Sequence, residues 1–284
     1  MPEPGANLEC VLKAGAARLR RAGVPGPMPE AVRIWSGLQG TTPTAAFLNR
    51  SVPVGDDPAT LFRAAIARRA SGEPLPYVTG WTGFRHLLLR CDRRALIPRP
   101  ETEGLVGLVL RVAPAGVVAD IGTGTGCIAL SLATEGRYAR VIGVDHSAGA
   151  LGLARENRTL TGATVDLMAG DLSTPLAGSS LDLLVSNPPY IAEAEYRDLD
   201  PSVRNWEPAA ALRSGADGLE ATRRLLFEGK RTVRPGGWLA LEVDSRRAEQ
   251  AAGMAGAIGW TEVSLREDVF GRVRYLLAKR SETA

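Results

Sequence analysis

The chain has 284 residues, of which 45% are hydrophobic and 23% are charged, and its formal net charge is +3. This composition excludes a disordered chain, and a net charge this small gives no indication of a nucleic-acid partner. No apolar run reaches the roughly 18 residues of a membrane span, and the N-terminus lacks the apolar middle of a signal peptide, so we expect a cytoplasmic protein without membrane attachment.

Residues 1–75 are predicted to form a small helical domain. Apolar residues recur at helical spacing in residues 8–23 and again in residues 57–72. Clusters of Gly and Pro in residues 23–30 and 38–45 are typical of turns between helices.

Residues 76–100 are predicted to be a linker between this helical domain and a larger domain, residues 101–284. Within the linker, an apolar stretch is interrupted at Cys91–Arg94. This pattern indicates a β-hairpin that is centred on Cys91–Arg94 and closes at Pro98.

From residue 101 onward, short apolar runs alternate with helix-like stretches. The predicted strands are residues 116–122, 140–145, 164–170, 181–186 and 238–244. The predicted helices between and after them are residues 127–136, 148–160, 219–233 and 246–259. Apolar strands that alternate with helices predict an α/β fold with a Rossmann-like, doubly wound and mostly parallel sheet. The tail, residues 266–280, adds one more strand, which we expect at an edge of the sheet and antiparallel.

A glycine-rich loop follows the first predicted strand. That strand ends at Asp120, and alternating glycine and threonine residues lead into the next helix: Gly122, Thr123, Gly124, Thr125 and Gly126. Glycines let the backbone turn sharply and approach a ligand closely, and open α/β sheets bind ligands at this end of their strands. The loop therefore predicts a ligand site, although a purely structural turn gives the same pattern.

Two further carboxylates follow the next two strands. Asp145 ends the second strand, where a carboxylate can accept hydrogen bonds from both ribose hydroxyls of a nucleoside. Asp171 follows the third strand and is suitably placed for an adenine amino group. We include the neighbouring Leu172 and His146 in this predicted nucleoside site, His146 at the edge of the adenine pocket or in solvent rather than as a base.

The loop does not favour a dinucleotide as the cofactor. Its spacing is G-x-G-x-G and lacks the third glycine of the dinucleotide fingerprint. Asp120 would also repel a pyrophosphate, and no nearby cation compensates. S-adenosylmethionine has no phosphate, and its positive amine suits Asp120, so it is the predicted cofactor.

A second motif, Asn187-Pro188-Pro189-Tyr190, ends the strand at 181–186. Two prolines cannot extend a central strand, because neither has an amide hydrogen to donate. In their order, "DIGTGTG", "VD" and "NPPY" resemble the class I S-adenosylmethionine-dependent methyltransferases. Asn-Pro-Pro-Tyr is similar to the motif of those enzymes that methylate planar nitrogens.

This resemblance implies a role for each residue of the motif. A planar amide nitrogen is a poor nucleophile, because its lone pair is delocalised. The Asn187 side-chain oxygen and the Pro188 carbonyl would accept the two N–H bonds of the target nitrogen. Pro189 would stiffen the turn, and Tyr190 would lie against the flat substrate group. Asn187 would thus border both the cofactor and the substrate.

Five further stretches resemble the family that methylates the glutamine of peptide chain release factors. They are residues 72–80, 96–103, 206–219, 233–242 and 268–274. The resemblance implies methyl transfer to the side-chain amide nitrogen of the glutamine in a Gly-Gly-Gln loop, with S-adenosylhomocysteine as the second product. It makes residues 101–284 the methyltransferase domain, gives residues 1–75 a role in recognising the release factor, and places Arg99 at the substrate site. We expect a monomer.

The chain departs from the family pattern in places, and two other functions fit parts of it. Asp244-Ser245 stand where the family usually has glycine, Leu172 stands where relatives often have an aromatic residue, and residues 1–59 match only in helical character. One alternative is a methyltransferase of exocyclic amino groups in DNA or RNA, which shares Asn-Pro-Pro-Tyr. The other is a non-catalytic binding module that keeps a cofactor fold.

The thiols and imidazoles give no indication of a metal site. Cys10, Cys91 and Cys127 are odd in number and far apart, which fits reduced thiols, and the only histidines are His86 and His146. Cys127 follows the glycine loop, and we expect it to be a small buried residue at a helix start rather than a nucleophile.

Overall fold

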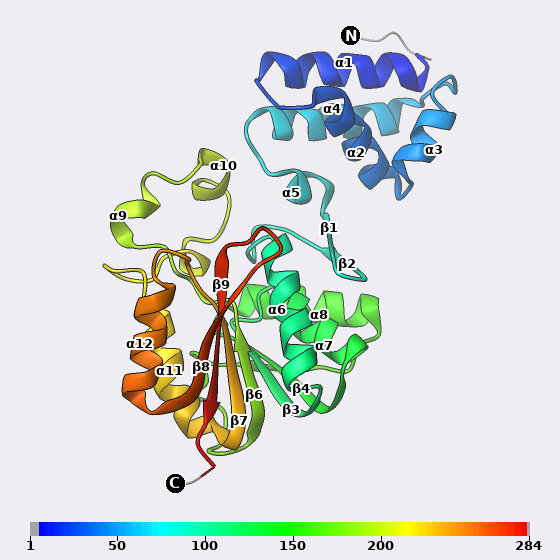
Figure 1. Ribbon diagram of the computed structural model, residues 1–284. Coiled ribbons are helices and arrows are strands. Elements are labelled where there is room, and N and C mark those ends of the chain that lie inside the picture. The colour runs from blue at the N-terminus through cyan, green and yellow to red at the C-terminus, as the bar shows by residue number, and fades with distance from the viewer. Residues whose placement is uncertain (1–5, 283–284) are drawn as a thin grey trace. The chain divides into compact units, whose positions relative to one another are not determined.

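The computed structural model of the protein describes residues 6–282 (Figure 1). The chain divides into two compact units. The first contains the residues up to Trp81 together with Asp200–Trp206, and the second contains Thr82–Leu199 and the residues from Glu207 onward. The domain boundaries expected at residues 75 and 100 stay predictions, and the outermost parts of those domains, residues 1–5 and 283–284, lie outside the described residues.

The first unit is helical. Its helices are α1 (Leu8–Arg21), α2 (Pro27–Gln39), α3 (Pro43–Leu48), α4 (Asp56–Ala70), α5 (Leu75–Thr79) and α10 (Pro201–Arg204). The two helices predicted within residues 8–23 and 57–72 are confirmed as α1 and α4. In the core of this unit, the rings of Trp35 and Phe62 pack edge to face with their centroids 5.6 Å apart.

The turn predicted over residues 23–30 is wrong in its second half, because α2 already begins at Pro27. Proline is well suited to the first turn of a helix, since its missing amide hydrogen would have no partner there. The glycine and proline cluster therefore contains both a turn and a helix start.

A two-stranded hairpin, β1 (Trp81–Phe84) and β2 (Leu87–Arg90), follows the first run of helices. The hairpin prediction is confirmed, but its predicted centre at Cys91–Arg94 is wrong, because the strands turn at Arg85–His86. Residues 91–94 instead form a local turn, in which the Asp92 carboxylate accepts hydrogen bonds from the backbone amide and the guanidinium of Arg94. A short-range pair of this kind competes with strand formation.

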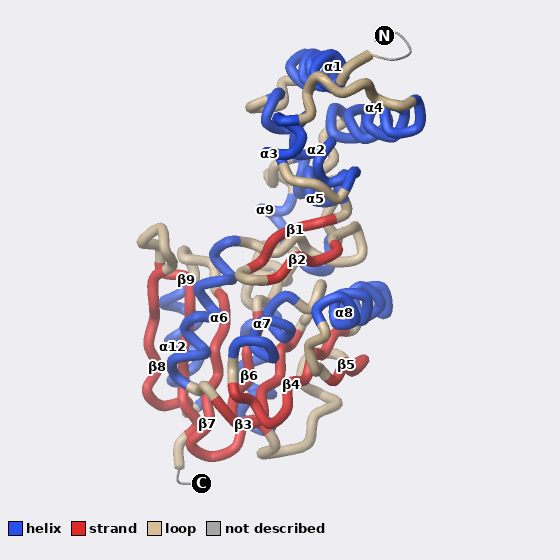
Figure 2. The backbone as a smooth tube through the Cα atoms, turned by 90° about the vertical axis from the view of Figure 1, so that its right-hand side faces the viewer, coloured by secondary structure: helices blue, strands red, loops and turns tan. Residues whose placement is uncertain are grey.

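The second unit is built on a seven-stranded sheet with the order β5-β4-β3-β6-β7-β9-β8 (Figure 2). Its strands are β3 (Ala115–Ile121), β4 (Arg137–Asp145), β5 (Asp166–Ala169), β6 (Leu181–Ser186), β7 (Val233–Glu242), β8 (Trp260–Glu267) and β9 (Val273–Arg280). The strands from β3 to β7 are parallel, and β9 and β8 are antiparallel to their neighbours. The predicted doubly wound, mostly parallel sheet with an antiparallel edge is confirmed.

The end of the chain differs from the prediction in one respect. The tail strand, β9, does not lie at the edge but between β7 and β8, and residues 260–267 form the edge strand, which was not predicted. The physical reason is burial: β9 buries its four central residues, whereas most residues of β8 are exposed or only partly buried. An edge strand with one solvent face carries little apolar signal.

Helices cover both faces of this sheet (Figure 1). They are α6 (Pro100–Val112), α7 (Cys127–Glu135), α8 (Ala148–Thr161), α11 (Glu220–Thr232) and α12 (Ala248–Ile258), with the short elements α9 (Glu193–Tyr196) and η1 (Ala209–Ala211). Successive β3 residues alternate between two cores: Val118 packs with α6 and α7, and Ala119 packs with α11 and α12. This alternation explains why β3 is apolar on both faces.

The register of the parallel strands aligns their carboxyl ends along one side of the sheet. Asp120 at the end of β3 pairs with Gly143 on one side and Val185 on the other, so the segments that follow β3, β4 and β6 emerge together. The end of β7 is in register with them, since Ser186 pairs with Leu241. Within the described part of the chain, no helix is long and apolar enough to cross a membrane.

Candidate functional site

A cavity of about 390 Å³ lies in the second unit, at the carboxyl ends of the parallel strands. Its volume is within the range of roughly 300–1,000 Å³ that small-molecule sites occupy. Most of the predicted site residues line it: Arg99, Gly122, Thr123, Gly124, Thr125, Asp145, His146, Asp171, Leu172, Asn187 and Pro189. The predicted residues that do not line it are Asp120, Gly126, Pro188 and Tyr190.

The glycine loop adopts a conformation that other residues rarely reach. Gly122, Gly124 and Gly126 have φ angles of 72°, 57° and 84°, all in the left-handed region that disfavours a Cβ. The backbone amides of Gly122 and Thr123 both donate to the carbonyl of Val144 in β4. The loop is therefore tied to the neighbouring strand, and its glycines are required by the backbone.

Asp145 lines the cavity, and backbone amides hold its carboxylate in place. Its Oδ2 accepts a hydrogen bond from the Gly124 amide and its Oδ1 accepts one from the Ser147 amide, both at 2.9 Å. Each carboxylate oxygen can accept a second hydrogen bond. Asp145 is therefore held in one orientation while it keeps an acceptor site on each oxygen, as the predicted contact with two ribose hydroxyls needs.

Asp120 lies behind the loop and is 0% exposed. Its Oδ2 accepts hydrogen bonds from the Thr123 hydroxyl at 2.6 Å and from the Ala129 amide at 3.2 Å, whereas its Oδ1 has no partner. Burial raises the pKa of Asp120 to about 7, although the Thr123 and Ala129 donors oppose this shift. Thr123, not Asp120, lines the cavity, so a direct contact between Asp120 and a ligand amine stays a prediction.

The predicted adenine end of the site lies at the rim. Asp171, Leu172 and His146 line the cavity, and the Asp171 and His146 side chains are exposed. Asp171 forms an ion pair with Arg224 of α11 at 2.8 Å, a partner that the sequence did not indicate. An adenine contact by Asp171 would therefore share this carboxylate with Arg224.

Asn187 is joined to two buried residues from distant parts of the chain. Its Nδ2 donates to Thr102 Oγ1 at 3.0 Å, and Thr102 Oγ1 donates to Glu242 Oε2 at 2.7 Å. Thr102 is 2% exposed and Glu242 is 1% exposed. Burial raises the pKa of Glu242 to about 7. Sequence reasoning missed both residues, although they lie in stretches, 96–103 and 233–242, that resemble the family.

The other residues of the motif are packed around Asn187. Pro188 is buried, Pro189 lines the cavity, and Tyr190 is partly buried. Burial, followed by the nearby Glu242 charge, raises the pKa of Tyr190 to about 12. A Cβ added at Gly218 would lie 2.6 Å from the Tyr190 carbonyl oxygen, so only glycine lets residues 206–219 pass this close to the motif.

Arg99 lines the cavity but its charge is already paired. Its Nη2 donates to Glu207 Oε1 at 2.5 Å, and the second carboxylate oxygen accepts a hydrogen bond from the Ile97 amide at 3.1 Å. The Glu207 side chain is buried. Arg99 and Glu207 thus join the two family-like stretches 96–103 and 206–219, and Glu207 is a partner that the sequence did not reveal.

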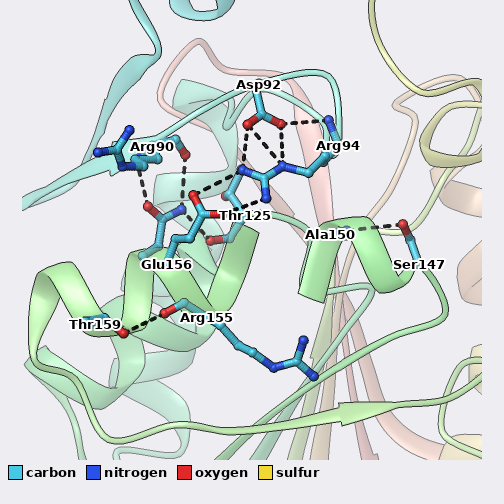
Figure 3. Close-up of polar contacts among 10 residues, drawn as sticks. Arg90, Asp92, Arg94, Thr125, Ser147, Ala150, Arg155, Glu156 and Thr159 are labelled. Atoms are coloured by element: carbon cyan, nitrogen blue, oxygen red, sulfur yellow. Dashed lines mark hydrogen bonds and ion pairs between the residues drawn. The ribbon is translucent and has the colours of Figure 1, made fainter. Parts of the chain in front are cut away.

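Figure 3 shows how the segment after the hairpin is held against α8. Arg94 forms ion pairs with Asp92 and with Glu156 of α8, each at 2.7 Å. The next residue of α8, Asn157, is fully buried; its Oδ1 accepts from the Arg90 amide, and its Nδ2 donates to the Thr125 carbonyl of the glycine loop. One buried amide therefore fixes the glycine loop relative to the end of β2.

Asp244, which stands where the family usually has glycine, also has a structural partner. Its carboxylate pairs with Arg246 at 2.7 Å and with Arg247. Arg247 in turn pairs with Glu195 of α9 at 2.7 Å. This departure from the family pattern therefore connects the start of α12 with the segment that follows the Asn187 motif.

Two of the cysteines, Cys91 and Cys127, have a thiol pKa raised by burial. Cys127 is the first residue of α7, and burial raises the pKa of its thiol to about 12. Burial also raises the pKa of Cys91 above its usual range. Thiols of this kind are poor nucleophiles. The prediction that Cys127 is buried is wrong, because Cys127 is only partly buried and lines the cavity. Within residues 6–282, no group of three His, Cys, Asp or Glu side chains is placed to hold a metal ion.

Comparison with known proteins identifies the family. The family model described as "PrmC N-terminal domain" matches residues 11–80, and "Methyltransferase small domain" matches residues 104–200. A release factor glutamine methyltransferase from Deinococcus radiodurans is 40% identical over 281 residues, which cover 97% of this chain and 99% of that protein. The enzyme of the same name from Geobacter sulfurreducens is 39% identical, and the match covers 89% of this chain and 89% of that protein.

The chain belongs to the release factor glutamine methyltransferase family. As a member of that family it is a methyltransferase, and the resemblance predicted from its motifs is confirmed. A third relative, from Moorella thermoacetica, is 40% identical over 97% of this chain and 99% of its own length.

Solved structures show the same fold at low sequence identity. A methyltransferase from Pyrococcus furiosus has a TM-score of 0.51 and 18% identity, over 68% of this chain and 88% of that chain. The T. thermophilus 16S rRNA N2 G1207 methyltransferase, solved with AdoMet and guanosine, has a TM-score of 0.51 and 16% identity, over 70% of this chain and 49% of its own. These likenesses show the class I methyltransferase fold for this family member.

Proposed function

We propose that the protein transfers a methyl group from S-adenosylmethionine to the side-chain amide nitrogen of the glutamine in the Gly-Gly-Gln loop of a peptide chain release factor. The relatives are named release factor glutamine methyltransferases, which supports a release-factor glutamine as the target. The observation that carries the proposal is the position of Asn187, which lines the same cavity as the glycine loop and Asp145. The cytoplasmic location expected from the sequence fits this substrate.

The residues of the cavity suit S-adenosylmethionine. Asp145 offers a free acceptor site on each oxygen for the ribose hydroxyls, and the left-handed glycines let the loop backbone lie close to a ligand. The negative charge of Asp120 behind Thr123 favours a positive amine, and Leu172 and His146 border the adenine end. S-adenosylmethionine bound there would supply the electrophilic methyl group, with S-adenosylhomocysteine as the second product.

The chain's own residues then act mainly by orienting the target nitrogen. Asn187 Oδ1 and the Pro188 carbonyl are the proposed acceptors for the two amide hydrogens, and Tyr190 is the proposed support for the flat amide. Acceptors fixed in advance hold the nitrogen in line with the methyl group and stabilise the positive charge that develops on it. The nitrogen forms a bond to the methyl carbon as the sulfur–methyl bond breaks, and one of its hydrogens is then lost as a proton to solvent water.

The charges around the cavity favour a protein substrate over a nucleic acid. The arginines that line it each pair with a carboxylate: Arg94 with Glu156, Arg99 with Glu207, Arg213 with Glu193, and Arg224 with Asp171. A nucleic-acid site needs cations that are free to bind phosphates. Neutralised arginines at the rim therefore count against the DNA or RNA alternative.

The experiment that tests this function is mass spectrometry after incubation with isotopically labelled S-adenosylmethionine. Release factors, DNA and RNA are offered in parallel reactions. The proposal expects label on one glutamine of a release factor, in the Gly-Gly-Gln peptide. Label on nucleic acid alone would contradict the substrate, and no label on any substrate would favour a binding module.

A further inference from the structure

We infer that Thr102 and Glu242 are positioning residues, which set the orientation of the Asn187 carboxamide so that its oxygen, and not its nitrogen, faces the substrate. The inference rests on the proposed function, because it concerns the group that holds the target nitrogen. Neither residue is within the Asn187-Pro188-Pro189-Tyr190 motif, and they come from α6 and the end of β7.

The direction of each hydrogen bond carries the argument. A carboxamide has two ends of nearly equal size but opposite function, since one end accepts hydrogen bonds and the other donates them. Thr102 has one hydroxyl hydrogen, and it donates this hydrogen to Glu242 Oε2 at 2.7 Å. Its oxygen is then an acceptor for Asn187 Nδ2, at 3.0 Å. With Nδ2 bound in this way, Asn187 Oδ1 is the end left for the substrate.

Glu242 determines the polarity of this chain because an ionised carboxylate can only accept. Burial raises its pKa to about 7, and the Glu101 charge adds to this rise, whereas the Thr102 hydrogen bond and the positive charges of Arg274 and Arg99 oppose it. Above about pH 7 the ionised carboxylate therefore accepts the hydrogen of Thr102. The Arg274 side chain is itself largely buried on β9, where its Nε pairs with Asp268 Oδ2 at 3.5 Å. The positive charge of Arg274 therefore acts on both Asp268 and Glu242.

The place of Thr102 is fixed from several sides. Thr102 lies in the first turn of α6, where the Tyr275 hydroxyl of β9 donates to the Glu101 carbonyl at 2.6 Å. A Cβ added at Gly104 would lie 2.2 Å from the same hydroxyl oxygen, so α6 and Tyr275 are in close contact. From the hairpin, Arg85 donates to the Glu103 carbonyl at 2.9 Å. Such contacts hold a helix start in register, which a positioning hydroxyl requires.

The test compares variants that keep or remove the hydroxyl. Thr102→Val removes it at nearly constant volume, and Thr102→Ser keeps it. We expect Thr102→Val to lower kcat for methyl transfer about 10- to 100-fold, with little change in the KM for the release factor or the Kd for S-adenosylmethionine, because one buried polar pair loses its partner. Thr102→Ser is expected to restore most of kcat, and Thr102→Ala, which is matched to it in size, is expected not to.

Glu242→Gln tests the polarity directly. The new amide can donate to Thr102, which would turn the hydroxyl toward Asn187 and present the Asn187 nitrogen to the substrate hydrogens. We expect kcat to fall at least as far as in Thr102→Val. The matched control is Thr232→Val, because Thr232 is fully buried and its hydroxyl donates to the Glu228 carbonyl of its own helix, at 3.3 Å. This control should keep the kcat of the unmodified enzyme.

The outcomes separate this inference from the proposed function. If the unmodified enzyme labels nucleic acid instead of a release factor, the proposed function fails, and the same variants are assayed on the nucleic acid. If the unmodified enzyme is active on either substrate, values of kcat within about twofold of normal for Thr102→Val and Glu242→Gln overturn the inference. Equal activity of Thr102→Ser and Thr102→Ala, or a loss explained by weaker cofactor binding, overturns it as well.

Discussion

The backbone amide of Gly124 donates to Asp145 Oδ2 at 2.9 Å, across 21 residues of sequence. This bond joins the glycine loop after β3 to the end of β4, so it links the two parts of the proposed cofactor site. A change at Asp145 therefore acts on the ribose contact and on the loop together.

Asp145→Ala is expected to weaken the binding of S-adenosylmethionine by at least tenfold in Kd. Two charge-assisted hydrogen bonds to ribose are lost, each worth about 1.5–3 kcal/mol. Isothermal titration calorimetry measures the change. The matched control is Asp166→Ala, which removes an exposed carboxylate paired with Arg140 on the next strand. Equal affinities in Asp145→Ala and the control would remove Asp145 from the ribose site.

Asn187→Ala is expected to reduce turnover by roughly 100- to 1000-fold, as the loss of one preorganised hydrogen-bonding group typically does. The fold should persist, because Asn187 is only partly buried. Single-turnover methyl transfer to a release factor isolates the affected step from product release. Near-normal transfer by this variant would contradict the mechanism.

Asp120→Asn is expected to change how stability depends on pH. Burial raises the pKa of Asp120 to about 7 in the folded protein, from an ordinary value of 3.8. Between pH 3.8 and about 7, Asp120 carries a proton in the folded state but has lost it in the unfolded state. Asp120 therefore lowers the free energy of unfolding as the pH rises, and this destabilisation is complete above about pH 7.

The measurement is the free energy of unfolding in urea for both proteins. From about pH 5 to about pH 8, the original protein should lose about 2–3 kcal/mol relative to Asp120→Asn. Parallel curves for the two proteins would show that Asp120 has an ordinary pKa.

Asn157→Ala is expected to destabilise the protein and to weaken cofactor binding. Its fully buried amide makes hydrogen bonds to the Arg90 amide, the Arg90 carbonyl and the Thr125 carbonyl. The loss of one such buried hydrogen bond typically lowers the free energy of unfolding by about 1–3 kcal/mol. Thr159→Ala, at an exposed position two residues along α8, is the control. A Kd for S-adenosylmethionine equal in both variants would show that Thr125 does not depend on Asn157.

Removal of residues 1–75 is expected to leave cofactor binding intact while methylation of the release factor falls sharply. The cavity and its lining lie entirely in the second unit, whereas the proposed recognition domain lies in the first. Calorimetry with the cofactor and transfer assays with the protein substrate give the two readouts. Full transfer activity of the shortened chain would contradict the recognition role of the helical part.

The sequence predicted the parts of the fold whose signals are local. The strand 116–122 and the glycine loop are contiguous, and the backbone demands glycine at Gly122, Gly124 and Gly126, so pattern and structure agree. The hairpin centre was wrong because a local turn at Asp92 and Arg94 interrupts the apolar run. The strand β8 was missed because an edge strand with a polar face shows little apolar periodicity.

Only the site residues at the ends of strands could be predicted from the sequence. Asp145 and Asn187 are polar residues at the ends of apolar runs, and a single sequence shows that pattern. Thr102 and Glu242 are 140 residues apart, and nothing local marks them as neighbours. The same holds for Arg99 and Glu207, whose pairing depends on the packing of distant segments.

The insertion of β9 between β7 and β8 has a consequence for synthesis. A chain grows from its N-terminus, so β7 keeps an open edge until the last strand has been made, and β8 has no neighbour to pair with before then. Tyr275, which holds the start of α6 beside Thr102, also belongs to this last strand. The proposed catalytic geometry is therefore completed only when β9 has been made, and a chain that stops before Val273 is expected to be inactive and prone to aggregate.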